Sequence, residues 1–148
     1  WLDPFKYADG MGYQIIQGFY AIASGGFFGK GLGLGRPDYI PFAESDYIFA
    51  SICEEMGILM GMGVVMLFLI LTYRGIKTSM EQHNKFYKYV AFCLSLIFAF
   101  QSLIMFGGIL KLIPLTGITI PFVSYGGSSI LSSFIALGIL QYASEENI

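Results

Sequence analysis

Hydrophobic runs without charge alternate with charged segments along the chain, and three of the runs approach the length of a membrane span. The first covers residues 56–73, the second 89–110, and the third ends in the helical pattern of 128–143. A hydrocarbon core about 30 Å thick requires about 20 apolar residues in one helix. We therefore expect an all-α polytopic membrane protein with spanning helices at 48–73, 89–110 and 128–143.

The segments between these runs predict which side of the membrane each one faces. Residues 74–88 form a short segment with four Lys or Arg residues, and such loops lie in the cytoplasm. We therefore expect 74–88 and the tail 144–148 to be cytoplasmic, and 1–47 and 111–127 to lie outside. The long loop 1–47 is also compatible with one short helix, because its residues 13–23 are largely apolar.

Composition agrees with the membrane class and excludes others. Hydrophobic residues make up 55% and charged residues 12% of the chain, against about 45–50% and about 25% in soluble domains. The net charge of −2 gives no sign of nucleic-acid binding. Cys53 and Cys93 fall inside apolar runs, so we interpret both as buried residues and not as a disulfide or metal pair.

A glycine-rich segment at residues 25–35 contains one lysine, Lys30. Glycines allow backbone amides to converge on an anion, and a lysine adds positive charge. The segment is not a P-loop, because Gly31 follows Lys30 where that motif has Ser or Thr. The two interpretations left open are an anion-binding loop and a tightly packed glycine turn.

Acidic residues stand before and inside the first hydrophobic helix. Ser45 or Asp46 fits an N-cap, and together with Glu44 these residues also fit a carboxylate site at the membrane surface. Glu54 and Glu55 lie further along, and acids inside a span are costly and often functional. The alternative is that both glutamates lie at headgroup depth and pair locally.

Small residues and hydroxyls mark places where other segments approach closely. In the segment 111–127, two prolines and several glycines predict irregular, re-entrant backbone facing the outer site, which survives at membrane depth only where its polar groups are satisfied. The glycines of the first span are interpreted as contacts for a neighbouring helix: Gly57, Gly61 and Gly63.

Four motifs in this order resemble the SEDS family of shape, elongation, division and sporulation proteins, such as RodA, FtsW and SpoVE. They are Gly-Lys-Gly-Leu-Gly at 29–33, Asp-Tyr-Ile-Phe-Ala at 46–50, Glu-Glu-Met-Gly at 54–57, and Pro-Leu-Thr-Gly-Ile-Thr-Ile-Pro-Phe-Val-Ser-Tyr-Gly-Gly-Ser-Ser at 114–129. The resemblance implies a ten-helix fold, of which this chain matches the large outer loop and the last three helices. The chain begins at Trp1, and we expect it to be part of a longer protein.

The resemblance also implies a function. Family members polymerise lipid II into glycan strands in the bacterial cell membrane, on its extracytoplasmic face, with a class B penicillin-binding protein as partner. The family motif assigns Asp46 as the catalytic general base. Pyrophosphate binding then falls to Lys30, Arg36, Gly29, Gly31 and Gly33, and supporting roles to Glu44, Ser45, Glu54, Glu55, Thr116, Ser124 and Tyr125.

Two other functions remain open at this point: a transporter that flips the lipid precursor, and a scaffold that holds a penicillin-binding protein without catalysis. The spanning runs offer few polar residues for a transport path, which favours the polymerase. No cofactor is evident and no metal-ligand set stands out, although a divalent cation could help to bind the pyrophosphate.

Overall fold

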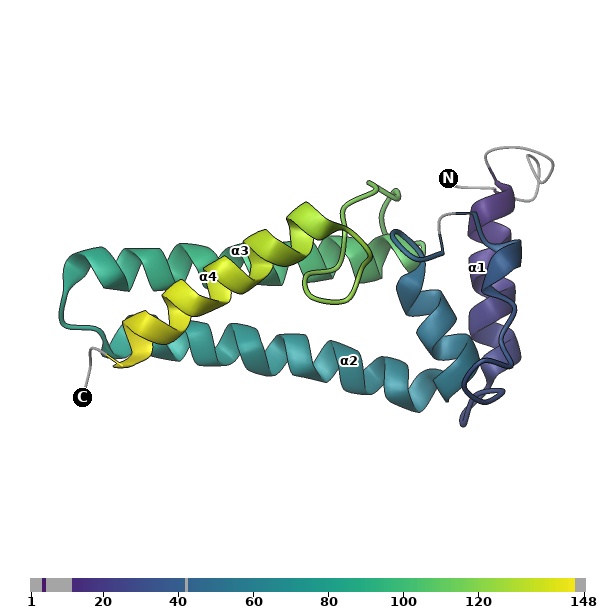
Figure 1. Cartoon of the computed structure of the whole chain (residues 1–148), viewed down its shortest axis with the longest axis horizontal. Helices are drawn as coiled ribbons and strands as arrows, with labels where there is room; N and C mark the ends of the chain where they lie inside the picture. Colours follow the sequence, from purple (N-terminus) through teal and green to yellow (C-terminus); the bar gives the residue numbers. More distant parts are fainter. Residues whose placement is uncertain (1–3, 5–11, 42, 146–148) are drawn as a thin grey trace.

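The computed structural model describes residues 4, 12–41 and 43–145, which form an all-helical structure (Figure 1). Three helices in this part of the chain are long and apolar enough to cross a membrane, as the hydrophobic runs predicted. The helices are α1 (Tyr13–Gly25), α2 (Ile48–Glu81), α3 (Lys85–Ile109) and α4 (Gly127–Glu145), with a short 3-10 turn η2 (Pro37–Tyr39).

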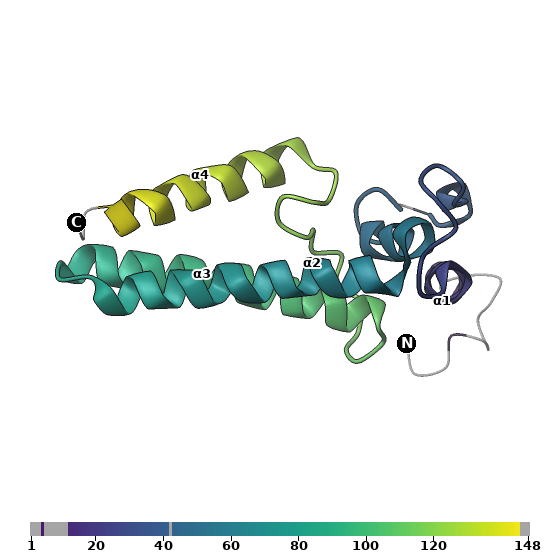
Figure 2. The same cartoon turned by 90° about the horizontal axis from the view of Figure 1, so that it is seen from below.

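Helices α2 and α3 run antiparallel side by side, and α4 leans across them (Figures 1 and 2). A Cβ added at Gly75 of α2 would overlap the hydroxyl of Ser95 on α3, so these helices approach closely at a glycine. The Tyr87 and Tyr142 rings, 5.7 Å apart, join α3 to α4 near the C-terminus.

The basic segment 74–88 is mostly helical, which differs from the expected loop. Helix α2 continues to Glu81 and α3 begins at Lys85, so only residues 82–84 connect them. Lysine, arginine and glutamate are good helix formers, and the exposed pair Lys77–Glu81 spans one turn at 3.6 Å. The side chain of Asn84 accepts a hydrogen bond from the amide of Phe86 and caps α3.

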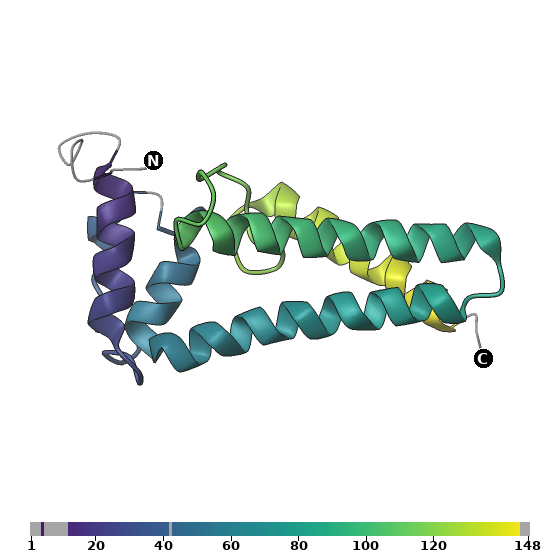
Figure 3. The ribbon, with the colours of Figure 1, turned by 180° about the vertical axis from the view of Figure 1, so that it is seen from behind.

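Helix α2 is interrupted at Gly57, where the backbone has φ 81° and ψ 168°. The segment Ile48–Met56 turns aside toward α1, while the longer part of α2 runs along α3 (Figure 3). The 24 residues from 58 to 81 rise about 36 Å, enough to cross a bilayer core about 30 Å thick. The straight span expected from residue 48 is therefore broken before residue 58.

Helix α1 lies across the end of the bundle, nearly perpendicular to α2 and α3 (Figures 1 and 2). The ring of Tyr47 packs against Gly18 of α1, where a Cβ would overlap it. The main core lies at this end, and the Phe49 and Phe106 rings within it are 4.9 Å apart. We call α1, the described residues from 26 to 47, the segment Ile48–Met56 and the loop 111–126 the end layer, and residues 58–81 of α2 together with α3 and α4 the bundle.

The bundle exposes apolar side chains over most of its length, including Leu69, Ile70 and Phe100. Such continuous exposure is unfavourable in water but suits contact with lipid or with further helices. Cys93 lies on this exposed surface of α3, so the interpretation of both cysteines as buried is wrong for Cys93 and holds for Cys53.

Candidate functional site

Asp46 lies directly before α2, beside the loop 111–126. It is half-buried, and a Cβ added at Gly117 would lie 3.8 Å from its Oδ2 atom. Gly117 has φ 66°, a conformation that L side chains rarely adopt. A glycine at this position therefore allows the turn that brings the loop beside the aspartate.

Hydrogen bonds tie this loop to the residues just before Asp46. The buried hydroxyl of Ser124 donates to the carbonyl of Ser45 at 2.7 Å and accepts from the amide of Ile120 at 2.9 Å. The amide of Tyr125 donates to the carbonyl of Glu44 at 2.8 Å. The structure thus brings together residues that are about 80 positions apart, as the proposal of a loop facing the site requires.

The start of α2 differs from the expected N-cap at Ser45 or Asp46. Tyr47 occupies the N-cap position and makes no side-chain capping bond, because its buried ring packs toward α1 instead. Burial, and to a smaller extent the charge of Asp46, raises the pKa of the Tyr47 hydroxyl to about 12. Tyr47 is therefore a structural neighbour of Asp46 that stays neutral at physiological pH.

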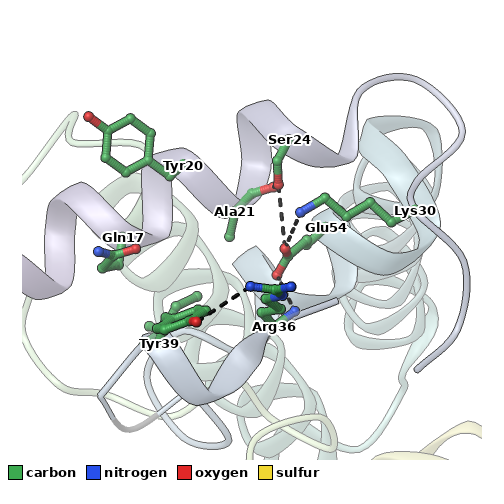
Figure 4. Close-up of a pocket in the computed structure, with 9 residues that line it drawn as sticks. Gln17, Tyr20, Ala21, Ser24, Lys30, Arg36, Tyr39 and Glu54 are labelled. Atoms are coloured by element: carbon green, nitrogen blue, oxygen red, sulfur yellow. Dashed lines mark hydrogen bonds and ion pairs between the residues drawn. The ribbon is translucent and has the colours of Figure 1, made fainter. Parts of the chain in front are cut away.

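Glu54 is the centre of a second polar cluster (Figure 4). Its side chain is only 5% exposed, and Lys30 Nζ lies 2.6 Å from its Oε1 atom. The hydroxyl of Ser24 donates to the same oxygen at 3.4 Å, and the amide of Arg36 donates to Oε2 at 3.3 Å. Of the two interpretations of the glutamates, local pairing describes Glu54.

The glycine-rich loop packs against the interruption in α2. The amides of Lys30 and Gly31 donate to the carbonyls of Glu54 and Glu55 at 3.0 and 2.9 Å, and the amide of Ile58 donates to Gly26 at 3.0 Å. These bonds satisfy backbone groups that the interrupted helix leaves unpaired. Of the two interpretations of this segment, tight packing accounts for these two amides.

Glycine is required at several of these contacts. Gly29, Gly31 and Gly33 have φ between 73° and 110°, and a Cβ at Gly29 would overlap the carbonyl of Glu55. The sequence suggested that Gly57 contacts a neighbouring helix. The structure shows a different contact, because a Cβ at Gly57 would overlap the carbonyl of Phe27 in the glycine-rich loop.

Lys30 and Arg36 line one small cavity of about 170 Å³, together with Glu54 and Tyr39 (Figure 4). The guanidinium of Arg36 is exposed, lies 5.9 Å from the centre of the Tyr39 ring and donates to its hydroxyl at 3.4 Å. The two cations expected to act together do lie around the same space. Asp46 lies two residues before the other end of Ile48–Met56, and the helix from Ile48 to Glu54 rises about 9 Å.

The remaining predicted residues lie apart from this cavity. Glu44 and Glu55 line a more apolar groove of about 350 Å³, together with Leu32 and Ile52. Thr116 is exposed on the loop 111–126, as is the side chain of Tyr125. Among the described residues, no group of three His, Cys, Asp or Glu side chains could hold a metal ion.

Sequence reasoning assigned no role to Ser24 or Tyr39, and it included Tyr47 and Gly117 only as members of longer motifs. Ser24 is 30 positions from Glu54, and no local pattern links a helical serine to so distant a partner. Gly57 carried a signal, since a glycine beside two acids inside a helix marks a weak point, but its spacing with Gly61 suggested helix packing.

The fold and the two clusters define a helical membrane protein whose polar chemistry is concentrated at one end of its spanning helices. The sequence pattern of a family described as cell cycle proteins (FtsW, RodA and SpoVE) matches residues 1–148. The chain belongs to this family.

Relatives carry informative names. Peptidoglycan glycosyltransferase RodA of Mycobacterium tuberculosis is 47% identical over 140 residues, which cover 95% of this chain and 30% of the relative. Stage V sporulation protein E of Bacillus subtilis is 41% identical over 142 residues (95% and 39%), and the probable peptidoglycan glycosyltransferase FtsW of B. subtilis is 42% identical over 140 (93% and 35%). The chain thus spans about a third of the length of these relatives.

Proposed function

We propose that this chain supplies the general base of a peptidoglycan glycosyltransferase that polymerises lipid II. The observation that carries the proposal is the placement of Asp46, half-buried beside the glycine turn of the loop 111–126, in a chain similar to enzymes named for this activity. The proposed enzyme lies in the bacterial cell membrane, with the end layer on the extracytoplasmic face. A class B penicillin-binding protein is the proposed partner.

In this mechanism the carboxylate of Asp46 accepts the proton from the attacking hydroxyl of the acceptor sugar. The new glycosidic bond forms as the bond between the donor anomeric carbon and the pyrophosphate breaks, with inversion at that carbon. One carboxylate is sufficient, because pyrophosphate leaves without protonation. General-base catalysis of this kind contributes about 10²–10⁴-fold to the rate.

The leaving pyrophosphate requires positive charge on the side of the donor sugar opposite the attacking hydroxyl. Arg36 is the proposed ligand, because its exposed guanidinium lines the cavity of the end layer and can bind phosphate in a bidentate manner. A divalent cation bound with the substrate would supply the same positive charge, and no cofactor is otherwise proposed.

The test is Asp46→Asn in the intact membrane protein that carries this chain, purified with its partner and supplied with lipid II. We expect the polymerisation rate to fall by about 10²–10⁴-fold, because asparagine cannot accept the proton. Asp38→Asn is the matched control, since Asp38 is exposed in η2 and away from the loop 111–126. A rate near wild type for Asp46→Asn would contradict the assignment, and lipid II flipping in vesicles without polymerisation would favour the transporter.

A further inference from the structure

The structure also suggests how Asp46 is held in place, and the starting point is the buried carboxylate of Glu54. A buried charge is costly unless it is paired and hydrogen-bonded. Glu54 receives donors from three separate segments: α1 through Ser24, the glycine-rich loop through Lys30, and the chain before η2 through the amide of Arg36. The ion pair with Lys30, at 2.6 Å, is the shortest of the three interactions.

The segment Ile48–Met56 is held by side contacts and not by a continuous helix. These are the polar contacts above, the Phe49–Phe106 ring contact with α3, and the close packing of Cys53 at Gly61 of α2. At Gly57 the helical pattern is interrupted: the amide of Ile58 bonds to Gly26, and the carbonyl of Glu54 accepts from Lys30. The glycine-rich loop and α1 therefore supply the polar contacts that orient the segment, in addition to its apolar contacts with α3 and with the rest of α2. A helix joined to the bundle through a glycine can turn about that glycine when its side contacts are lost.

Asp46 lies just beyond the far end of this segment. Glu54 is three residues from the glycine, whereas Asp46 lies two residues beyond Ile48, which is itself about 9 Å of helix rise from Glu54, so a small rotation at Gly57 moves the aspartate more than the glutamate. Catalytic groups are sensitive to such movement, since a displacement of about 1 Å can lower a rate by about 10²-fold.

We propose that Glu54 is a positioning residue: its ion pair with Lys30 fixes the segment Ile48–Met56 and thereby the carboxylate of Asp46. This inference rests on the proposed function, because it assigns a role relative to the proposed base. It also reassigns Lys30, which then serves Glu54 and leaves the substrate pyrophosphate to Arg36.

The experiment is a double-mutant cycle on polymerisation kinetics in the intact membrane protein, with Lys30→Met, Glu54→Gln and both together. We expect each single change to lower kcat by about 10- to 100-fold, with KM for lipid II changed by less than about twofold. The double variant should be no worse than either single one, because residues that act as a pair are not additive. Lys30→Arg, which keeps the cation, should retain most of the activity.

Three results would overturn the proposal. If Lys30→Met raises KM with kcat unchanged, Lys30 binds substrate and does not position the base. If the losses of kcat caused by the two substitutions multiply in the double variant, Lys30 acts independently of Glu54. If Glu54→Gln keeps the wild-type kcat, the carboxylate does not position the base. Should Lys30→Met fail to fold because it leaves Glu54 buried and unpaired, the double variant decides, since it contains neither charge.

A second measurement separates this proposal from the proposed function, because it requires no turnover. With Cys53 and Cys93 replaced by alanine, the thiol introduced by Asp46→Cys is labelled with a maleimide, with and without Glu54→Gln. We expect Glu54→Gln to change the labelling rate severalfold, and Glu81→Gln, at the exposed end of α2, to leave it unchanged. An unchanged rate with Glu54→Gln would refute positioning even if Asp46 is the base.

Discussion

The end layer and the bundle are parts of one apolar chain, but they are held together by different interactions. In the end layer, buried polar groups link distant segments, as in the bonds from Ser124 to Ser45 and from Lys30 to Glu54. In the bundle, α2 and α3 meet at small residues such as Gly75 and at the Phe68–Phe106 ring contact, and many large apolar side chains face outward. The comparison teaches that the end layer is specified by buried polar groups, because each has few other partners with which it could form a hydrogen bond. The bundle relies instead on close packing in an apolar environment.

The largest expected difference between the two regions concerns glycine. Gly57→Ala should destabilise the end layer by more than about 2 kcal/mol, since positive φ alone costs about 1–2 kcal/mol and the new Cβ overlaps the carbonyl of Phe27. Gly63→Ala is the matched control in the bundle, where a Cβ would meet only the sulfur of Met60, at 3.9 Å. Thermal unfolding in detergent and proteolysis of the loop 26–35 measure both. An equal loss of stability in Gly57→Ala and Gly63→Ala would contradict the proposed difference between the end layer and the bundle.

A smaller difference is expected for serine. Ser124→Ala should cost about 1–3 kcal/mol, because it leaves the amide of Ile120 and the carbonyl of Ser45 without this partner. Ser132→Ala removes a hydroxyl from the exposed face of α4, where it bonds only locally to the carbonyl of Ser129, and should change stability by less than about 0.5 kcal/mol. Denaturant unfolding gives the free energies. Faster hydrogen exchange at the amide of residue 120 would locate the loss, and unchanged exchange there would argue against it.

The smallest effect is expected for tyrosine and depends on pH. Among the described residues, the buried hydroxyl of Tyr47 has no hydrogen-bond partner, so Tyr47→Phe should be neutral or stabilise by up to about 1 kcal/mol. Because the folded pKa is about 12 against an ordinary value of 10, the wild type should lose stability as the pH rises from 10 toward 12.

The phenylalanine variant should lose less stability than the wild type over this range, since residue 47 then releases no proton on unfolding. Tyr73→Phe, at an exposed position of α2, is the control and should leave the pH dependence of stability unchanged. Unfolding followed between pH 9 and pH 12 compares the three proteins. If Tyr47→Phe loses as much stability at alkaline pH as the wild type, the loss belongs to another group.

Part of the candidate site could be predicted from local patterns. The motif at 46–50 identified Asp46, and the prolines and glycines of 111–127 predicted irregular backbone near it. The glycine-rich segment was recognised as special, but local sequence could not decide between binding an anion and packing against a helix. That decision depends on the carbonyls of Glu54 and Glu55, which become available only where α2 is interrupted.

The sequence by itself determined the helical class, the three spans and their order, because hydropathy and length act locally and a membrane imposes them on each segment separately. Only the tertiary structure decided that α2 breaks at Gly57, that Lys30 pairs with Glu54, and that the loop 111–126 lies against Asp46. These features are contacts between segments 24 to about 80 residues apart. Their geometry depends on the path of the whole chain, which no local periodicity records.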